Sequence, residues 1–174
     1  MVKSINSRDY NKWRSHFTQG NSLIGFIPTM GALHQGHLYL VQQAKRQCSQ
    51  VVVSIFINPR QFNDANDLEN YPVRLEEDFA LLANEGVDFV LAPSAYEIYP
   101  VGDTSSLDMS SYLHLAQGLE GDRRPGHFQG VVDVVSRLLN IVKPQKMYLG
   151  KKDYQQLKVL EAMVRKEKFS IDVV

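Results

Sequence analysis

One stretch organises this chain: Pro28-Thr29-Met30-Gly31-Ala32-Leu33-His34-Gln35-Gly36-His37-Leu38. Residues 22–27 before it form an apolar run of strand length, and the apolar residues after it recur at helical spacing as far as Cys48. A strand therefore leads into a helix through a short turn. In an open parallel sheet, ligands bind where the chain leaves the carboxyl end of a strand, and the start of the next helix presents backbone N–H groups to an anion. The stretch predicts a nucleotide-phosphate site.

Two histidines and two glycines give this turn its chemistry. His34 and His37 are three residues apart, so both imidazoles lie on one side of the first helical turn, where each can donate a hydrogen bond to a phosphate oxygen. Gly31 and Gly36 would let the backbone approach a ligand closely. The spacing alone is equally compatible with two surface histidines that flank a turn.

The same pattern of strand and helix recurs along the chain. Strands are predicted over residues 50–57, 87–91, 147–150 and 169–174, and helices over 7–18, 74–85, 131–142 and after residue 153. Parallel strands joined by right-handed helical crossovers give an α/β fold, a doubly wound parallel sheet with helices on both faces. With 174 residues the chain is long enough for one domain and too short for two.

Composition disfavours several classes of partner. Lysine and arginine total 19, as do aspartate and glutamate, so no basic excess favours a nucleic acid. The single cysteine, Cys48, can form neither an internal disulfide nor a thiolate metal cluster. No apolar run approaches membrane-spanning length, and the first residues lack the apolar stretch of a secretory signal. We expect a cytoplasmic protein that binds neither nucleic acid nor membrane.

Polar groups also follow other predicted strands. Asn58 and Gln61 come after the predicted strand over residues 50–57, and their amides suit a hydroxy-acid substrate. Asn-Pro is, however, also an ordinary turn signal. Lys152 follows the strand over 147–150 and could reach a phosphate, although exposed lysines are common. Residues 119–130 form a charged, glycine-rich loop before a helix, compatible with a site or with a solvated loop.

Several motifs carry a family resemblance. Residues 34–37 resemble the signature of the HIGH nucleotidyltransferase superfamily, and residues 28–37 as a whole are similar to the pantoate–β-alanine ligase family. Further segments resemble that family in the same order along the chain: Asn58-Pro59-Arg60-Gln61-Phe62, Glu97-Ile98-Tyr99-Pro100, Arg124-Pro125-Gly126-His127-Phe128-Gln129-Gly130-Val131 and Lys152-Asp153-Tyr154-Gln155-Gln156. Some positions depart from the family pattern. Arg60 stands where the family usually has methionine, Val73 stands where it has arginine after Tyr-Pro, and Lys151 replaces a glutamate.

The resemblance implies an enzyme with a Rossmann-like fold and a two-step reaction. It implies an ATP-dependent, amide-bond-forming ligase of the coenzyme A pathway, which joins pantoate to β-alanine through pantoyl adenylate. The products are pantothenate, AMP and pyrophosphate. ATP would be the co-substrate and Mg²⁺ the accompanying metal ion. Because phosphoryl chemistry of this kind leaves the protein little covalent work, catalysis would rest on positioning and on stabilising negative charge.

The resemblance also implies site residues. The catalytic set is His34, His37 and Lys152. The nucleotide-binding set is Pro28, Thr29, Met30, Gly31, His34, Gly36, His37, Gly150, Lys152 and Asp153. The substrate-binding set is Met30, Asn58, Gln61, Arg124, His127 and Gln156. The magnesium candidates are Glu77 and Asp78, although the helix dipole alone explains most acids in the first turn of a helix.

The family continues beyond a stretch like this one into a Ser-Ser-Arg-Asn segment and a smaller C-terminal domain that closes over ATP. We therefore expect residues 1–174 to be a Rossmann-like N-terminal domain that binds ATP and pantoate, forms a homodimer, and shows little ligase turnover without that lid. Two alternatives stay open. One is another member of the superfamily, such as a dinucleotide-forming nucleotidyltransferase or an aminoacyl-tRNA synthetase core. The other is a non-catalytic nucleotide-binding or oligomerising fragment.

Overall fold

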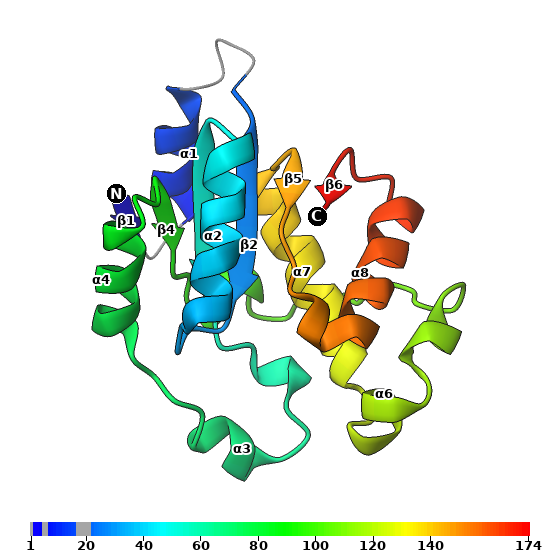
Figure 1. Ribbon diagram of the computed structural model, residues 1–174. Helices are drawn as coiled ribbons and strands as arrows, with labels where there is room; N and C mark the ends of the chain where they lie inside the picture. Colours follow the sequence, from blue (N-terminus) through cyan, green and yellow to red (C-terminus); the bar gives the residue numbers. More distant parts are fainter. Residues whose placement is uncertain (1, 5–6, 17–21) are drawn as a thin grey trace.

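A six-stranded parallel sheet forms the centre of the computed structural model, which describes residues 2–4, 7–16 and 22–174 (Figure 1). Its strands are β1 (Val2–Ser4), β2 (Ile24–Thr29), β3 (Gln50–Ile55), β4 (Phe89–Leu91), β5 (Lys146–Met147) and β6 (Asp172–Val173). Their order across the sheet is β1-β4-β3-β2-β5-β6, and every pair is parallel. The two central strands, β2 and β3, pair over six residues and are buried almost throughout, which explains their continuous apolar sequences.

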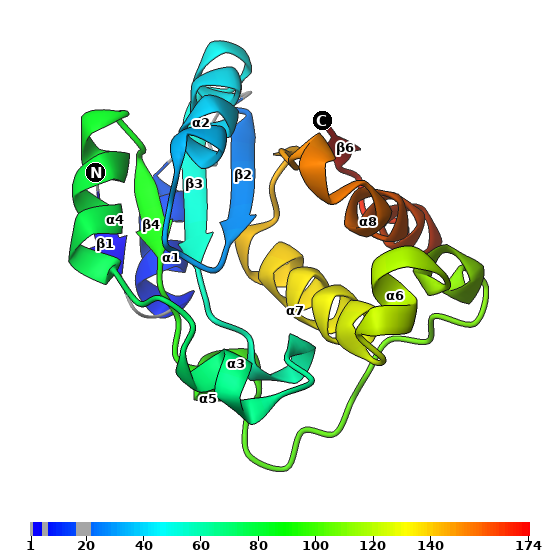
Figure 2. The same ribbon diagram turned by 60° about the horizontal axis from the view of Figure 1, so that its bottom comes forward.

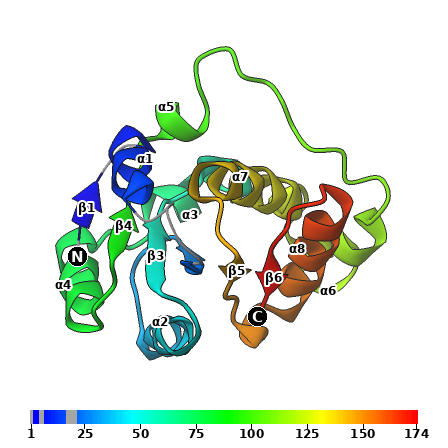
Figure 3. The same cartoon turned by 90° about the horizontal axis from the view of Figure 1, so that it is seen from above.

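Helices cover both faces of this sheet (Figure 3). On one face, α1 (Ser7–Ser15), α7 (His127–Val142) and α8 (Tyr154–Lys166) enclose the larger core, which contains Phe26 and Val52. On the other face, α2 (Gln35–Gln47) and α4 (Leu75–Asn84) enclose a second core around Ile27 and Val53. Neighbouring residues of one strand thus point to opposite cores, as the period of two in a strand requires.

Short elements complete the structure. They are α3 (Ala65–Glu69), α5 (Ala95–Ile98), α6 (Leu119–Arg123) and the 3₁₀ turns η1 (Pro59–Gln61), η2 (Leu113–Ala116) and η3 (Lys151–Asp153). Figure 2 shows β2, β3 and β4 running in the same direction, with the segment that contains α3 beyond their carboxyl ends. No helix in the described part of the chain is both long and apolar enough to cross a membrane.

The order of the strands creates a switch point between β2 and β5. From β2 the chain passes through α2 to β3 on one side, whereas β5 and β6 lie on the other side of β2. Adjacent connections therefore leave β2 and β5 in opposite directions. In doubly wound sheets a crevice opens at the carboxyl ends of two such strands.

The predicted fold class, a doubly wound parallel sheet with helices on both faces, is confirmed. Some boundaries differ from the predictions. Helix α7 begins at His127, four residues before the predicted helix, because Gly126 adopts a left-handed conformation (φ 81°) that turns the chain into it. The edge strand β1 was missing from the predicted strands, since three residues are too few to show a period, and it pairs in register with β4.

Candidate active site

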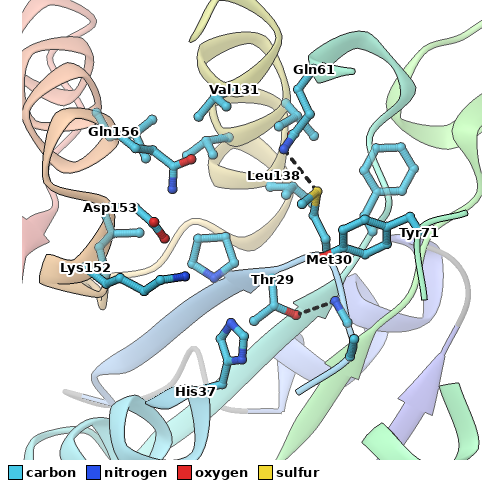
Figure 4. A pocket seen from close by; sticks show the side chains of 18 of the residues that line it. Thr29, Met30, His37, Gln61, Tyr71, Val131, Leu138, Lys152, Asp153 and Gln156 are labelled. Atoms are coloured by element: carbon cyan, nitrogen blue, oxygen red, sulfur yellow. Dashed lines mark hydrogen bonds between the residues drawn. The ribbon is translucent and has the colours of Figure 1, made fainter. Parts of the chain in front are cut away.

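A pocket of about 320 Å³ opens at the switch point between β2 and β5 (Figure 4). Its walls come from the turn after β2, the start of α2, η1, α7, η3 and α8. Most of the residues implied by the family resemblance line it: Pro28, Thr29, Met30, Gly31, His34, His37, Gln61, Lys152, Asp153 and Gln156. The tertiary structure therefore brings residues from distant parts of the sequence around one cavity.

The two histidines at the start of α2 are held by main-chain hydrogen bonds. His34 is the N-cap residue, and its Nδ1 accepts the N–H of Gly36 at 3.0 Å. The Nδ1 of His37 accepts the N–H of His34 at 3.3 Å, and the two ring centroids are 4.1 Å apart. Because both Nδ1 atoms act as acceptors, each neutral ring carries its proton on Nε2. Two Nε2–H donors are thus available at one end of the pocket.

The positively charged form of His37 is disfavoured. Burial lowers the pKa of His37 below its ordinary value, and the neighbouring His34 lowers it further, while Asp78 and Asp153 oppose the shift. His37 is therefore neutral at neutral pH and acts toward an anion as a hydrogen-bond donor without a net charge.

The turn between β2 and α2 is shaped by a buried carboxylate. Gly31 and Ala32 have positive φ angles of 85° and 49°. Asp78, on α4, is 2 % exposed and accepts the N–H of Ala32 at 2.9 Å and that of Leu33 at 2.8 Å, one with each carboxylate oxygen. A Cβ on Gly31 would lie 2.9 Å from Asp78 Oδ2, so the glycine permits this contact. Asp78 thereby holds the turn that presents the histidines.

The second magnesium candidate lies in a different environment. The side chain of Glu77 is 72 % exposed, and its carboxylate is 3.9 Å from the guanidinium of Arg74. Neither Glu77 nor Asp78 is among the residues that line the pocket at the switch point. Within residues 2–4, 7–16 and 22–174, no group of three or more His, Cys, Asp or Glu side chains could hold a metal ion.

A cation and an acid face the histidines from the other side of the switch point. Lys152 and Asp153 belong to η3, directly after β5, and Figure 4 shows both side chains at the pocket across from His37. Two glycines that the family resemblance implies do not line the pocket. Gly150 is the N-cap residue of η3, and Gly36 lies behind the ring of His34. Lys152 and the two Nε2–H groups therefore form one end that suits a phosphate.

Two amides and an apolar wall form the rest of the pocket. Gln61 Nε2 donates to the sulfur of Met30 at 3.0 Å, and Gln156 projects from α8 (Figure 4). Sequence reasoning missed Tyr71, Phe56 and several aliphatic lining residues: Val131, Val134, Val135, Leu138, Leu149 and Leu160. The valines and Leu138 repeat at helical spacing, a pattern that by itself predicts packing on the sheet. They do pack there, and the same face of α7 also borders the cavity.

Three of the predicted substrate-binding residues lie behind the pocket. Asn58 is 1 % exposed, and Arg124 and His127 are absent from the lining. His127 Nδ1 donates to the carbonyl oxygen of Gln61 at 2.9 Å, and its Nε2 lies 3.3 Å from Arg124 Nη1. Burial lowers the pKa of His127, while the hydrogen bond to Gln61 opposes that shift.

Arg124 completes this arrangement. Its Nη2 donates to the same carbonyl of Gln61 at 3.3 Å, and its Nη1 is paired with Glu120 at 2.7 Å. Both Arg124 and His127 thus hold the main chain of Gln61.

Comparisons with known proteins agree on one family. The sequence matches the family described as Pantoate-beta-alanine ligase over residues 2–174. It is 47% identical over 164 residues to pantothenate synthetase of Bartonella bacilliformis, and 49% identical over 152 residues to that of Acinetobacter baylyi. The crystal structure of pantothenate synthetase from Thermus thermophilus superposes with a TM-score of 0.91 at 43% identity. The pantoate-beta-alanine ligase of Francisella tularensis, complexed with beta-gamma ATP and beta-alanine, superposes with a TM-score of 0.95 at 41% identity.

The chain spans only part of each of these proteins. The matches cover 92% of this chain and 57% of the Bartonella protein, and 87% of this chain and 53% of the Acinetobacter protein. Both crystal structures cover 100% of this chain, which corresponds to 60% of the Thermus chain and 66% of the Francisella chain.

Proposed function

The chain belongs to the pantoate-beta-alanine ligase family, and we propose that its pocket binds pantoate next to the α-phosphate of ATP for the formation of pantothenate. One observation carries this proposal. Donors suited to phosphate (His34, His37 and Lys152) and amides suited to a hydroxy acid (Gln61 and Gln156) line the same cavity.

The proposed reaction has two balanced steps. A carboxylate oxygen of pantoate attacks the α-phosphorus of ATP, the bond to the β-phosphate breaks, and pyrophosphate leaves. The amine of β-alanine then attacks the acyl carbon of pantoyl adenylate and loses a proton. AMP leaves and carries with it the carboxylate oxygen that attacked phosphorus in the first step. In neither step does the protein form a covalent bond with substrate.

The residues at the phosphate end act by charge and hydrogen bonding. Negative charge moves onto the oxygens around the α-phosphorus as the new bond forms, and fixed donors that meet this charge lower the barrier. The Nε2–H groups of His34 and His37 are fixed by the main chain, and Lys152 supplies a full positive charge. Their arrangement before ATP binds reduces the reorganisation needed during the reaction.

The apolar wall supports pantoate as the acid. Pantoate carries a carboxylate, two hydroxyl groups and a carbon with two methyl groups. The branched side chains of α7, including Val134 and Leu138, offer an apolar surface for the methyl groups, while Gln61 and Gln156 offer hydrogen bonds to the hydroxyl and carboxylate oxygens. The Francisella tularensis enzyme was crystallised with beta-gamma ATP and beta-alanine, which supports ATP and β-alanine as the other two substrates of this chain.

In the proposed reaction the magnesium ion would accompany ATP. Both oxygens of Asp78 accept backbone N–H groups, and Glu77 faces solvent beside Arg74, so these two carboxylates do not fit a shared metal site. No step of the proposed reaction therefore depends on a metal held by the protein. The prediction that Glu77 and Asp78 bind magnesium therefore rests on the family resemblance alone.

We also propose that residues 1–174 act as the ATP- and pantoate-binding domain. The cytoplasmic location and the homodimer stay predictions of the sequence.

The test is pantoate-dependent chemistry on ATP. The protein is incubated with ATP, Mg²⁺, pantoate and β-alanine at stoichiometric protein concentration, and AMP, pyrophosphate and pantothenate are quantified. The proposal expects pyrophosphate only when pantoate is present, and pantothenate only when β-alanine is added. AMP transfer to a nucleotide in place of pantoate would favour another nucleotidyltransferase, and ATP binding without products from any acceptor would favour a non-catalytic binding fragment.

A further inference from the structure

We propose that Asn58 and Tyr99 are positioning residues, which hold the side-chain amide of Gln61 with its NH₂ group toward the pocket so that it recognises an oxygen acceptor of the substrate. This inference rests on the proposed function, because it names how one wall of that site selects pantoate. It also changes the part assigned to Asn58, which the family resemblance places among the residues that hold pantoate directly.

The orientation of the Asn58 amide is fixed by two backbone groups. Its Oδ1 accepts the N–H of Arg60 at 3.2 Å, and its Nδ2 donates to the carbonyl oxygen of Gly130 at 3.0 Å. A backbone N–H can only donate and a carbonyl can only accept, so the positions of Asn58 oxygen and nitrogen are unambiguous. Gly130 makes this geometry accessible, since a Cβ there would lie 2.4 Å from the carbonyl oxygen of Arg60.

The orientation of Gln61 follows from that of Asn58. The second hydrogen of Asn58 Nδ2 is donated to a side-chain atom of Gln61 at 3.1 Å, which must therefore be the oxygen, Oε1. The NH₂ group of Gln61 then points into the pocket, where it contacts the sulfur of Met30 (Figure 4). A thioether sulfur is a weak acceptor. A carboxylate or hydroxyl oxygen of the substrate would replace it readily.

Tyr99 occupies the remaining acceptor position of Asn58. Its hydroxyl donates to Asn58 Oδ1 at 2.9 Å, and burial raises the pKa of Tyr99 to about 12, so the phenol remains a donor at neutral pH. The ring is held by two guanidinium groups, with the Cζ atoms of Arg60 and Arg137 at 3.8 Å and 4.9 Å from its centroid. Arg137 is in turn paired with Asp103 at 2.5 Å.

These contacts exhaust the hydrogen bonds that an asparagine side chain can make. Oδ1 of Asn58 accepts from Arg60 and Tyr99, and Nδ2 donates to Gln61 and Gly130. The side chain is 1 % exposed and outside the pocket lining. It therefore acts on the substrate through Gln61, whose side chain does line the pocket.

The experiment compares the removal of two tyrosine hydroxyls. Tyr99→Phe removes the donor to Asn58. Tyr112→Phe is the matched control, because the hydroxyl of Tyr112 is buried in the core against which Tyr99 packs but has no hydrogen-bond partner among the described residues. Pantoate and ATP dissociation constants are measured by calorimetry for the wild-type chain, both variants, Gln61→Ala and the double variant Gln61→Ala/Tyr99→Phe.

We expect Tyr99→Phe to weaken pantoate binding about three- to tenfold, the effect of one neutral hydrogen bond, and to leave ATP binding unchanged. Tyr112→Phe should change neither constant. In the Gln61→Ala background, Tyr99→Phe should cause no further loss, since the amide that it positions is gone. An equal loss with and without Gln61, or an equal loss for ATP and pantoate, would overturn the inference.

A ligand-free measurement separates this inference from the proposed function. Both side-chain amide hydrogens of Asn58 are bonded and buried, so their exchange with solvent should be slow and should accelerate several-fold in Tyr99→Phe but not in Tyr112→Phe. Fast exchange in the wild-type protein would refute the network. Slow exchange together with no pantoate binding would instead overturn the proposed function.

Discussion

The imidazole of His34 lies over the backbone of Gly36. Its Nδ1 accepts the Gly36 N–H at 3.0 Å, and its Cε1 would be only 2.9 Å from a Cβ at position 36. Gly36 therefore leaves room for the imidazole ring of His34. Its effect on a bound phosphate is indirect, through the position of that ring.

Gly36→Ala should separate the site from the stability of the fold. The new methyl group displaces the ring of His34, and we expect ATP to bind at least tenfold more weakly, a loss of about 1.4 kcal/mol or more. The free energy of unfolding should change by less than about 1 kcal/mol, because alanine favours the helix that contains position 36. Calorimetry and urea unfolding measure the two quantities. Unchanged ATP affinity would show that the position of His34 does not matter for the nucleotide.

Asp78→Asn should destabilise the protein in the absence of any ligand. The buried carboxylate accepts two backbone N–H groups of the turn after β2, and replacing one oxygen by NH₂ loses one of these bonds. We expect a loss of about 1.5 to 3 kcal/mol in the free energy of unfolding. Glu77→Gln is the control, and because that side chain is exposed its effect should be within about 0.5 kcal/mol. A normal stability for Asp78→Asn, with a defect only in the magnesium dependence of ATP binding, would support a metal ligand instead.

The free energy of unfolding should fall on acidification because of two histidines, the partly buried His37 and the buried His127. The pKa values of His37 and His127 are lowered in the folded protein, so below about pH 6.5 the unfolded chain binds protons that the folded chain does not. Their contribution is complete above this pH and is lost as the pH falls toward the folded pKa values, by at most about 1.4 kcal/mol per pH unit for each histidine.

Urea unfolding of the wild-type chain and of His127→Gln, each at about pH 7.5 and about pH 5.5, measures this effect on either side of the ordinary histidine pKa. The variant should lose less stability between the two values. Equal losses would show that His127 is not buried in its neutral form.

Lys152→Ala should slow adenylate formation much more than it weakens pantoate binding. In the proposed reaction Lys152 would face the α-phosphate, and the loss of one such charge typically costs about 2 to 4 kcal/mol of transition-state stabilisation. Lys151→Ala is the control, because Lys151 is the neighbouring lysine and does not line the pocket. The measurement is single-turnover release of pyrophosphate. The same rate in both variants would remove Lys152 from the phosphate end of the site.

The sequence predicted the central features of the fold because they are local. The turn over residues 28–38 and the apolar strands 50–57 and 87–91 carry their own periodic patterns, and the structure confirms both of these strands. Residues at the ends of successive parallel strands must meet at one edge of the sheet. His37, Gln61 and Lys152 could therefore be expected around one pocket from the sequence alone.

The roles of other residues depend on contacts between distant segments, which no local pattern reveals. Asp78 appears in the sequence as one of several acids at a helix start, and only the tertiary structure places its carboxylate against Ala32 and Leu33. His127 follows a charged loop, and only the fold directs its ring to the carbonyl of Gln61. The departure at Arg60 is likewise explained by a contact distant in sequence, its stacking on Tyr99.

Activation of pantoate by ATP is tested most directly by an isotope measurement. Pantoate labelled with heavy oxygen in its carboxylate is incubated with ATP, Mg²⁺, β-alanine and a stoichiometric amount of the protein, so that a single turnover suffices, and the AMP is analysed by mass spectrometry. Since the carboxylate oxygen that attacks the α-phosphorus leaves with AMP, we predict AMP that carries one heavy oxygen atom and pantothenate that retains the other. Unlabelled AMP, or label recovered in ADP or inorganic phosphate, would contradict attack by pantoate on the α-phosphorus in this pocket.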